Sequence, residues 1–401
     1  MSESLHTVTT MPTARQSGCP FDPPAELLQA RTHGPISRYP FPGNHPGWLV
    51  TGYDLARAVL ADSRFSSRKE LMRHPSIDVT GIEIPPAPPG EFLIMDEPQH
   101  SRYRKPLVGK FTVRRMRQLT ERIRQITDEH LDAMAAAGPP VDLVSAFAKP
   151  IPTIVICELL GVRHENREHF HEWAEILLGG EASNDEQMTA YFAINDYLAE
   201  LVAAKRAQPT DDILSDLTDT DLSDEELRGI GLLLLVAGLD TTASTLSLGT
   251  FALLRNPKQL HALRTDPDLI DQAVEEILRY LSVAKTFMRT ALEDVELGGH
   301  PIKAGDTVMV SYNTANRDPD RFTDPNVLDL SRSEARHLAF GHGIHQCLGQ
   351  QLARVELRTA FPALFERFPT LRLAVEPEEV QLRSESADIY GAKSLPVTWD
   401  V

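Results

Sequence analysis

The sequence predicts a mainly helical protein with small β-sheets, folded as one large domain. Helical patterns dominate the chain, and strand-like patterns appear in short segments after residue 20, near residues 295–310 and in the C-terminal tail. No linker divides the 401 residues, and a hydrophobic content of 42% is ample for a large buried core. Residues 1–20 are polar and are predicted to form a flexible leader before a domain that spans residues 21–401.

The clearest predicted helix covers residues 224–254. Ser223 and Glu226 form a capping box, which is a typical helix start. Thirty-odd residues at 1.5 Å each span roughly 45 Å, enough to cross the whole molecule. The middle of the segment is apolar on every side, so we expect it to be buried. Other helical patterns cover residues 54–62, 97–137, 151–207 (with breaks), 267–281 and 348–367.

The sequence predicts strands after the helical pattern at residues 267–281. Val295 and Leu297, a Gly298-Gly299 turn and residues 307–310 predict a hairpin and strands. The tail after residue 367 is also predicted to form strands.

Charge and cysteine content limit the possible functions. The net charge of −17 repels phosphate backbones, so we do not expect nucleic acid as a partner. Three cysteines do not make a disulfide framework and suit a reduced cytoplasm. The longest apolar stretch, residues 230–239, is too short to span a bilayer, so we expect no membrane association.

A short segment around Cys347 carries the strongest chemical signal. Two glycines, Gly341 and Gly343, precede the cysteine and suit a tight loop with positive φ, and a helical pattern starts directly after it. Free N–H groups and the helix dipole at such a position favour the thiolate. A thiolate is an axial ligand that pushes electron density onto haem iron and favours O–O cleavage.

The same segment permits a second interpretation. His337, His342, His345 and Cys347 are all residue types that bind zinc, although their spacing fits no closed zinc pattern well. A single cysteine is, in addition, most often a buried structural thiol.

The loop resembles the haem-ligand signature of the cytochrome P-450 superfamily. That signature runs Phe, two spacers, Gly, a spacer, Arg or His, a spacer, Cys, a spacer and Gly. Every required place is filled here, by Phe340, Gly343, His345, Cys347 and Gly349. The resemblance extends from about residue 21 to residue 399. It implies the cytochrome P-450 fold, haem b as cofactor and Cys347 as the iron ligand, with haem contacts at Phe340, Gly341, His345 and Gly349.

Polar residues interrupt the predicted buried helix at Asp240 and Thr241. Burying an Asp is costly without a partner or a purpose, and hydroxyls next to a buried carboxylate can relay protons. A Thr hydroxyl can equally donate to a carbonyl of its own helix. The segment resembles the family's oxygen-activation motif, which implies haem contacts at Ala237 and Gly238, a glycine that lets O2 approach, and proton delivery by Asp240 and Thr241.

Four further residues match the family's contacts to the haem propionates. His100 and Arg104 lie at i,i+4 on one helix face, and Arg289 and His345 match two more contacts. Arginine suits carboxylates because of its fork of donors.

The resemblance also implies a buried structural pair between Glu276 and Arg279. On charge spacing alone, a Glu and an Arg at i,i+3 form an ordinary surface ion pair. The family often adds an Arg from a downstream Pro-x-Arg-Phe segment, but Val327 stands at that place here. Arg332 is a candidate substitute.

No flavin or nicotinamide domain is recognisable in the sequence, so electrons must arrive from other proteins. The resemblance implies a ferredoxin with a ferredoxin reductase. Basic residues between Arg102 and Arg117 are the expected docking surface, although a solvated helix face explains the same charges. We expect a cytoplasmic monomer.

The reaction implied by the resemblance is the insertion of one oxygen atom from O2 into a C–H bond. The expected substrate is a hydrophobic secondary metabolite such as a polyketide, macrolide or terpenoid, as in soluble actinomycete-type members. A peroxide-driven haem hydroxylase and a non-enzymatic haem sensor are the alternatives, and the intact Asp240–Thr241 pair argues against both. The predicted pocket walls are Leu93, Ile94, Val236, Ala237, Phe287, Met288 and Ile389.

Overall fold

The computed structural model describes residues 6–8, 19–75, 77–163, 166–178, 182–333, 336–384 and 387–401. The chain forms two compact units, and each is assembled from separate stretches of sequence. The first unit comprises residues 1–87, 93–100 and 275–347; the second comprises residues 88–92, 101–274 and 348–401. The predicted boundary between a leader and a domain at residue 21 stays a prediction.

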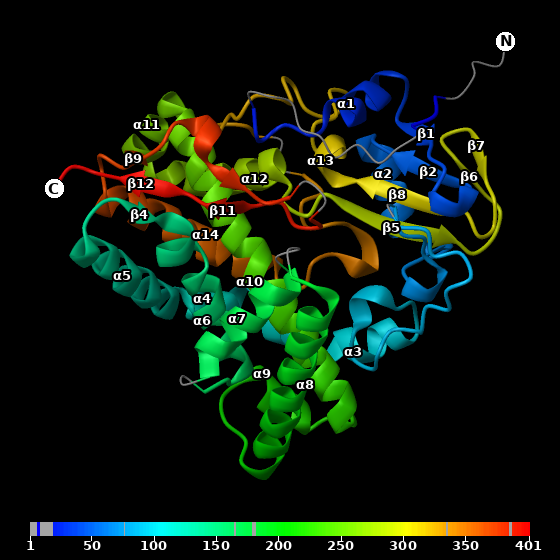
Figure 1. Ribbon diagram of the computed structural model, residues 1–401, viewed down its shortest axis with the longest axis horizontal. Coiled ribbons are helices and arrows are strands. Elements are labelled where there is room, and N and C mark those ends of the chain that lie inside the picture. Colours follow the sequence, from blue (N-terminus) through cyan, green and yellow to red (C-terminus); the bar gives the residue numbers. More distant parts are fainter. Residues whose placement is uncertain are drawn as a thin grey trace. The chain divides into compact units, whose positions relative to one another are not determined.

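A mixed five-stranded sheet forms the centre of the first unit (Figure 1). Its order is β1-β2-β8-β5-β3; β2 and β8 are parallel, and the other pairs are antiparallel. The strand bounds are Ile36–Arg38 for β1, Gly47–Val50 for β2, Phe65–Ser66 for β3, Thr286–Ala291 for β5 and Thr307–Ser311 for β8. The predicted hairpin is confirmed, with β6 at Val295–Leu297 and β7 at His300–Ile302.

Part of the predicted leader pairs with this sheet. The N–H of Val8 donates to the carbonyl of Arg38, and the N–H of Arg38 donates to the carbonyl of His6, both at 2.9 Å. Residues 6–8 therefore run parallel to β1 at its outer edge.

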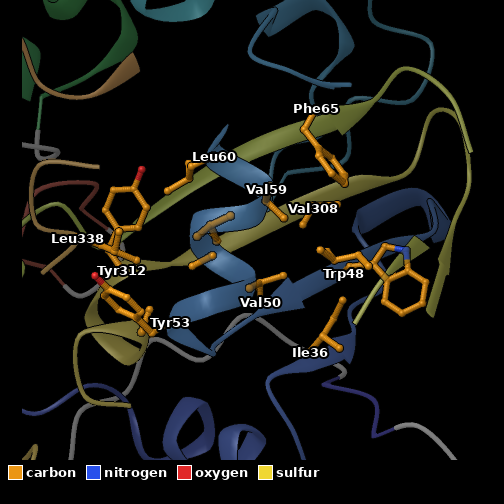
Figure 2. Packing of buried hydrophobic residues seen from close by; sticks show 14 of the residues in the cluster. Ile36, Trp48, Val50, Tyr53, Val59, Leu60, Phe65, Val308, Tyr312 and Leu338 are labelled. Carbon is orange, nitrogen blue, oxygen red and sulfur yellow. The ribbon is translucent and has the colours of Figure 1, made fainter. Parts of the chain in front are cut away.

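The apolar core of the first unit lies between the sheet and helix α2 (Tyr53–Ala61), which confirms the helix predicted at residues 54–62. Figure 2 shows Val59 and Leu60 of α2 in one cluster with the strand residues Val50 and Val308. Two shorter helices, α1 (Ala25–Thr32) and α13 (Tyr312–Ala315), belong to the same unit.

Helix α10 (Asp224–Arg255) is the central element of the second unit and packs against α6, α8 and α14. Ser223 and Glu226 form the predicted capping box, so the expected start of the helix is confirmed. The surrounding helices are α4 (Val113–Gln118), α5 (Thr120–Ala137), α6 (Pro150–Leu160), α7 (Arg167–Leu178), α8 (Asn184–Ala207), α9 (Ile213–Thr218), α11 (Pro257–Thr265) and α14 (Gln350–Arg367). Helices α3 (Gln99–Val108) and α12 (Ile270–Leu281) contribute residues to both units.

By length and composition, α10 is the one helix in the described part of the chain that could cross a membrane. However, 72% of its apolar window is buried within the protein, as in the core helix of a globular fold.

The C-terminal tail forms short strands, as the sequence predicts. Strands β4 (Val141–Asp142), β12 (Pro396–Thr398) and β9 (Arg372–Leu373) form one sheet, while β10 (Gln381–Leu382) pairs with β11 (Ala392–Ser394). The mainly helical fold class with small sheets is thereby confirmed.

A buried ionic network ties α12 to the loop that follows α13. Arg279 donates to both carboxylate oxygens of Glu276, at 2.7 and 2.8 Å, and both side chains are 1% exposed. Arg332 donates a third bond to Glu276 at 3.1 Å, and Arg279 also donates to the carbonyls of Asn316 and Pro325. Arg332 therefore supplies the second arginine that is missing at position 327, where Val327 stands. The expected structural pair of Glu276 and Arg279 is thus part of a three-residue network.

Removing the carboxylate of Glu276, which both arginines share, should destabilise the protein more than removing Arg332. Glu276→Gln leaves two buried guanidinium groups without a counter-charge, and we expect a loss of about 3–5 kcal/mol in the free energy of unfolding. Arg332→Ala should cost about 1–3 kcal/mol because the hydrogen bonds of its guanidinium to Glu276 and to the carbonyl of Thr323 are lost. Both values can be measured by urea unfolding.

Arg64→Ala serves as the control, since Arg64 pairs with Asp62 in an exposed position. Its loss should cost below about 1 kcal/mol. An Arg332→Ala protein as stable as the unmodified chain would contradict the assignment of Arg332 to the network.

Candidate functional site

Cys347 lies at the end of a loop that is closed by its own backbone. The N–H of Cys347 donates to the carbonyl of Phe340 at 2.8 Å, and the N–H of Gln346 donates to the carbonyl of Gly343 at 3.0 Å. The Cys347 side chain is exposed, whereas Cys157 is buried in α6. A closed backbone with an exposed thiol at its end presents the sulfur to a ligand.

Two glycines give the loop its shape. Gly341 and Gly343 have φ values of +67° and +74°, which confirms the predicted left-handed conformation. A Cβ at Gly343 would lie 2.2 Å from the carbonyl oxygen of Leu60 in α2. The loop therefore rests directly on the end of α2, and only a glycine fits there.

The loop is followed by α14, which begins at Gln350 with Gly349 as its N-cap residue. This start is two residues later than the predicted one. No atom in the described part of the chain lies within 4 Å of the position that a Cβ of Gly349 would take.

A cavity of about 580 Å³ lies beside the loop within the first unit. Its wall includes Ile344 and His345 from the loop, Arg289 from β5 and Ile94. The centre of the His345 ring lies 4.3 Å from that of the buried His100 ring, with the two rings tilted by 57°. Three of the residues predicted to bind propionates thus lie in this one unit.

Arg289 is a buried cation in the cavity wall. Burial lowers the pKa of its guanidinium, and the neighbouring Tyr312 and Asp96 act in the opposite direction. Its Nη1 donates to the carbonyl of Met288 at 2.8 Å, and no carboxylate in the described residues forms an ion pair with it. Such a guanidinium can bind an anionic group that enters the cavity.

The middle of α10 contains an exposed position. Ala237 is exposed and Thr241 is half-buried, while the residues from Thr242 to Leu253 are all buried. These two residues are four apart and share one helix face. The Thr241 hydroxyl donates to the carbonyl of Ala237 at 3.0 Å, which is the back-bonding alternative considered for the sequence.

Asp240 has a partner that the sequence analysis did not identify. Nη1 and Nη2 of Arg383 each lie 2.5 Å from an oxygen of the Asp240 carboxylate. The two side chains are 11% and 8% exposed. The one signal in the sequence was that a buried Asp needs a cation, and nothing distinguished Arg383 among 40 Lys and Arg residues.

Gly238 faces another helix. A Cβ at this position would lie 3.0 Å from Cγ1 of Ile156 in α6. The glycine therefore allows close packing of α10 against α6.

The remaining predicted pocket residues are spread over both units. Phe287 stacks on Tyr312 at 5.1 Å and packs against the apolar core of the first unit, and Met288 packs against a second cluster there. Of the seven predicted wall residues, Ile94 lines the 580 Å³ cavity. Leu93 and Ala237 are exposed, and Val236 and Ile389 are half-buried.

Part of the basic segment is neutralised within the second unit. Arg102 pairs with Asp221 and Glu226, and it lowers the pKa of Glu226 to about 2. Lys110 and Arg115 both pair with Asp216, at 2.5 and 3.4 Å. The cations without an ion pair to any described residue are Lys105, Arg114 and Arg117.

The zinc interpretation finds no geometric support. No group of three or more His, Cys, Asp or Glu side chains among the described residues is placed to hold a metal ion. His337 instead pairs with Glu275 at 3.2 Å, and His342 lies 3.4 Å from Arg57. Burial and the charge of Arg57 lower the pKa of His342.

Comparisons with known proteins identify the family of the chain. The family Cytochrome P450 matches residues 186–387. Cytochrome P450 105C1 of a Streptomyces species is 50% identical over 383 residues, which cover 94% of this chain and 96% of the relative. Pentalenic acid synthase of Streptomyces avermitilis is 43% identical and covers 95% of each chain. The crystal structure of CYP105P1 in complex with filipin I has a TM-score of 0.90 at 42% identity, with 98% of this chain and 99% of that chain covered.

The contact between Gly343 and α2 can be tested with a matched pair of glycines. Gly343→Ala combines a positive φ with a clash against backbone, and we expect it to cost about 2–5 kcal/mol in unfolding free energy. Gly299 has a similar φ of +79° but no described atom within 4 Å of a Cβ. Gly299→Ala should therefore cost only about 1–2 kcal/mol. Equal costs for the two variants would show that the contact with Leu60 is unimportant.

Proposed function

Because the chain belongs to the cytochrome P450 family and is a haem-thiolate monooxygenase, we propose that it oxidises a C–H bond of a hydrophobic secondary metabolite with electrons from a ferredoxin. The observation that carries the proposal is the Cys347 loop. Its thiol is exposed at the end of a closed backbone, and the same loop lines a cavity whose wall includes Arg289, which forms no ion pair with any described residue.

These residues fit haem b. The group needs one axial ligand and partners for two carboxylates, and the first unit offers a thiol, a buried guanidinium and the neighbouring rings of His100 and His345. Cys347 would bind the iron, and Arg289, His100, His345 and the half-buried Arg104 would bind the propionates. Bound in this way, haem supplies the activation of O2 and the transfer of one oxygen atom.

The remaining cofactor contacts are proposed for residues with small side chains or at the loop. The exposed Ala237 provides a flat surface on α10, and the open position of Gly349 allows close approach to the start of α14. Gly341 and the ring of Phe340 are proposed as further haem contacts at the loop. Gly238 supports this surface from the other side by letting α10 approach α6.

Proton delivery is proposed for Asp240 and Thr241. The Asp240 carboxylate would accept a proton from water, and the Thr241 hydroxyl would pass a proton to the reacting oxygen. The hydroxyl must then give up its bond to the carbonyl of Ala237. An intact acid–hydroxyl pair supports an O2-driven reaction over a peroxide-driven one.

The substrate class is supported by the names of relatives. They include a pentalenic acid synthase and a vitamin D3 dihydroxylase, and a solved relative contains filipin I. A nocardicin C N-oxygenase is also among them, which supports an enzyme and argues against a haem sensor. We propose a polyketide, macrolide or terpenoid as substrate, bound by the apolar residues predicted as pocket walls: Leu93, Ile94, Val236, Ala237, Phe287, Met288 and Ile389.

The first experiment is the absorption spectrum of the reduced, carbon monoxide-bound protein. We expect the strongly red-shifted Soret band that thiolate ligation produces, and we expect Cys347→Ser to lose it. Cys157→Ala is the matched control because this cysteine is buried in α6. It should keep the band, whereas a band typical of histidine-ligated haem in the unmodified protein would contradict the proposal.

The ferredoxin partner is proposed to dock at the unpaired cations Arg114 and Arg117. Arg114→Glu/Arg117→Glu should raise the KM for ferredoxin about tenfold at low salt, because steering by opposite charges is lost. The difference should shrink at about 0.5 M salt. Lys258→Glu, an exposed position on α11, is the control for net charge. An unchanged KM in the double variant would exclude this surface as the docking site.

We also propose that the protein is a monomer and that it is cytoplasmic.

A further inference from the structure

We propose that Asp96 is a positioning residue that fixes the haem-binding side chains His100 and Arg289 relative to each other, because it joins the first turn of α3 to strand β3. The inference rests on the proposed function, in which both side chains bind the haem propionates. It adds a residue outside the predicted haem contacts. Asp96 acts through its hydrogen bonds to other residues of the first unit and has no part in the reaction itself.

The Asp96 carboxylate holds the end of β3 through both of its oxygens. The Ser66 hydroxyl donates to Oδ2 at 2.5 Å, and the backbone N–H of Ser67 donates to Oδ1 at 2.7 Å. Ser66 and Ser67 are buried, and the Asp96 side chain is 26% exposed. Hydrogen bonds to a carboxylate are stronger than those between neutral groups. Since Ser66 and Asp96 are 30 residues apart, these bonds close the base of the segment that connects β3 with α3.

The same residue is connected to both haem-binding side chains. On one side, the carbonyl of Asp96 accepts the N–H of His100 at 2.9 Å, in the first turn of α3. On the other side, Ser66 of β3 pairs with Thr290 of β5, which directly follows Arg289. Asp96 thus links two elements that are far apart in the sequence and that each carry one proposed propionate partner.

The charge of Asp96 indicates that the carboxylate is kept for its hydrogen bonds. Asp96 and Arg289 both line the cavity beside the Cys347 loop. A negative charge in this wall opposes the binding of the anionic propionates. Arg68, whose Nε lies 3.8 Å from Oδ2 of Asp96, offsets little of that charge because its side chain is 46% exposed. An acid at this place therefore weakens ligand binding unless it keeps the wall in its shape.

Haem release from the loaded protein measures this positioning. The probe is an excess of apomyoglobin, which takes up haem as it dissociates. Asp96→Ala should release haem about tenfold faster, because two hydrogen bonds to a charged group are lost and both propionate partners move. Ser66→Ala should have a smaller effect of the same sign, since the N–H of Ser67 still donates to Asp96. A purely electrostatic role predicts the opposite sign, because removing a negative charge from the cavity wall favours the propionates.

A double variant identifies the route of the effect. If Asp96 acts by placing Arg289, the increase in release rate for Asp96→Ala/Arg289→Gln falls short of the product of the two single increases. An increase that reaches the full product would show that the two residues act independently, and it would refute the proposal.

Tyr39→Phe is the matched control. The Tyr39 hydroxyl donates to the carbonyl of Pro75 at 2.7 Å, so it holds the same connecting segment away from its base. This variant should release haem at the unmodified rate. An increase as large as that of Asp96→Ala would mean that general loosening of the segment causes the effect, and it would overturn the assignment to Asp96.

Limited digestion with trypsin tests the closed base without a measurement of haem release. Arg68, Lys69 and Arg73 are the trypsin sites of the connecting segment. The haem-loaded Asp96→Ala protein should be cut there several-fold faster than the unmodified protein, because opening of the base exposes the backbone. Unchanged cleavage would show that Asp96 does not hold the segment, and the proposal would fail.

The outcomes separate this proposal from the proposed function. If the unmodified protein shows the thiolate band and Asp96→Ala releases haem at the unmodified rate or more slowly, the positioning role is refuted and the haem-thiolate assignment stands. If the unmodified protein shows no thiolate band, the proposed function fails and this proposal fails with it. Faster release in Asp96→Ala and Ser66→Ala, with Tyr39→Phe unchanged, supports the positioning role.

Discussion

The requirement that a buried charge have a counter-charge determines much of this structure. Glu276 meets it with two arginines, because a single carboxylate at 1% exposure accepts from both Arg279 and Arg332. The carbonyls of Asn316, Pro325 and Val327 accept from the other N–H groups of Arg279. The helix α12 and the irregular segment after α13 are thus joined by hydrogen bonds that cannot be exchanged for water. The Cys347 loop follows this segment in the chain.

Arg289 is the informative exception to that requirement. It is 5% exposed, yet within the described chain it forms no ion pair. Evolution has little reason to keep such a cation in a protein core unless an anion binds to it, because the desolvation cost is large. Its position in the wall of a cavity beside His345 fits the carboxylates of a haem. The same physical rule therefore explains the paired charges as structural and supports the proposal that Arg289 binds an anionic ligand.

Asp240 shows an intermediate case. It is paired as completely as Glu276, but it lies beside the exposed face of α10 formed by Ala237 and Thr241. The helix is buried from Thr242 to Leu253, whereas Ala237 is exposed and has only a small side chain. The ion pair with Arg383 lowers the cost of burying the Asp240 carboxylate beside this exposed position.

The sequence by itself determined the elements whose signals are local. The start of α10 follows from Ser223 and Glu226, and the left-handed loop before Cys347 follows from Gly341 and Gly343. These features depend on residues within a few positions of each other, so short-range chemistry specifies them. Only the tertiary structure decided which arginine each buried carboxylate receives. Arg332 is 56 residues from Glu276 and Arg383 is 143 residues from Asp240. Neither arginine belongs to a periodic pattern in the sequence. The partner of a buried carboxylate depends on which distant segments the fold brings together, and no local spacing encodes that.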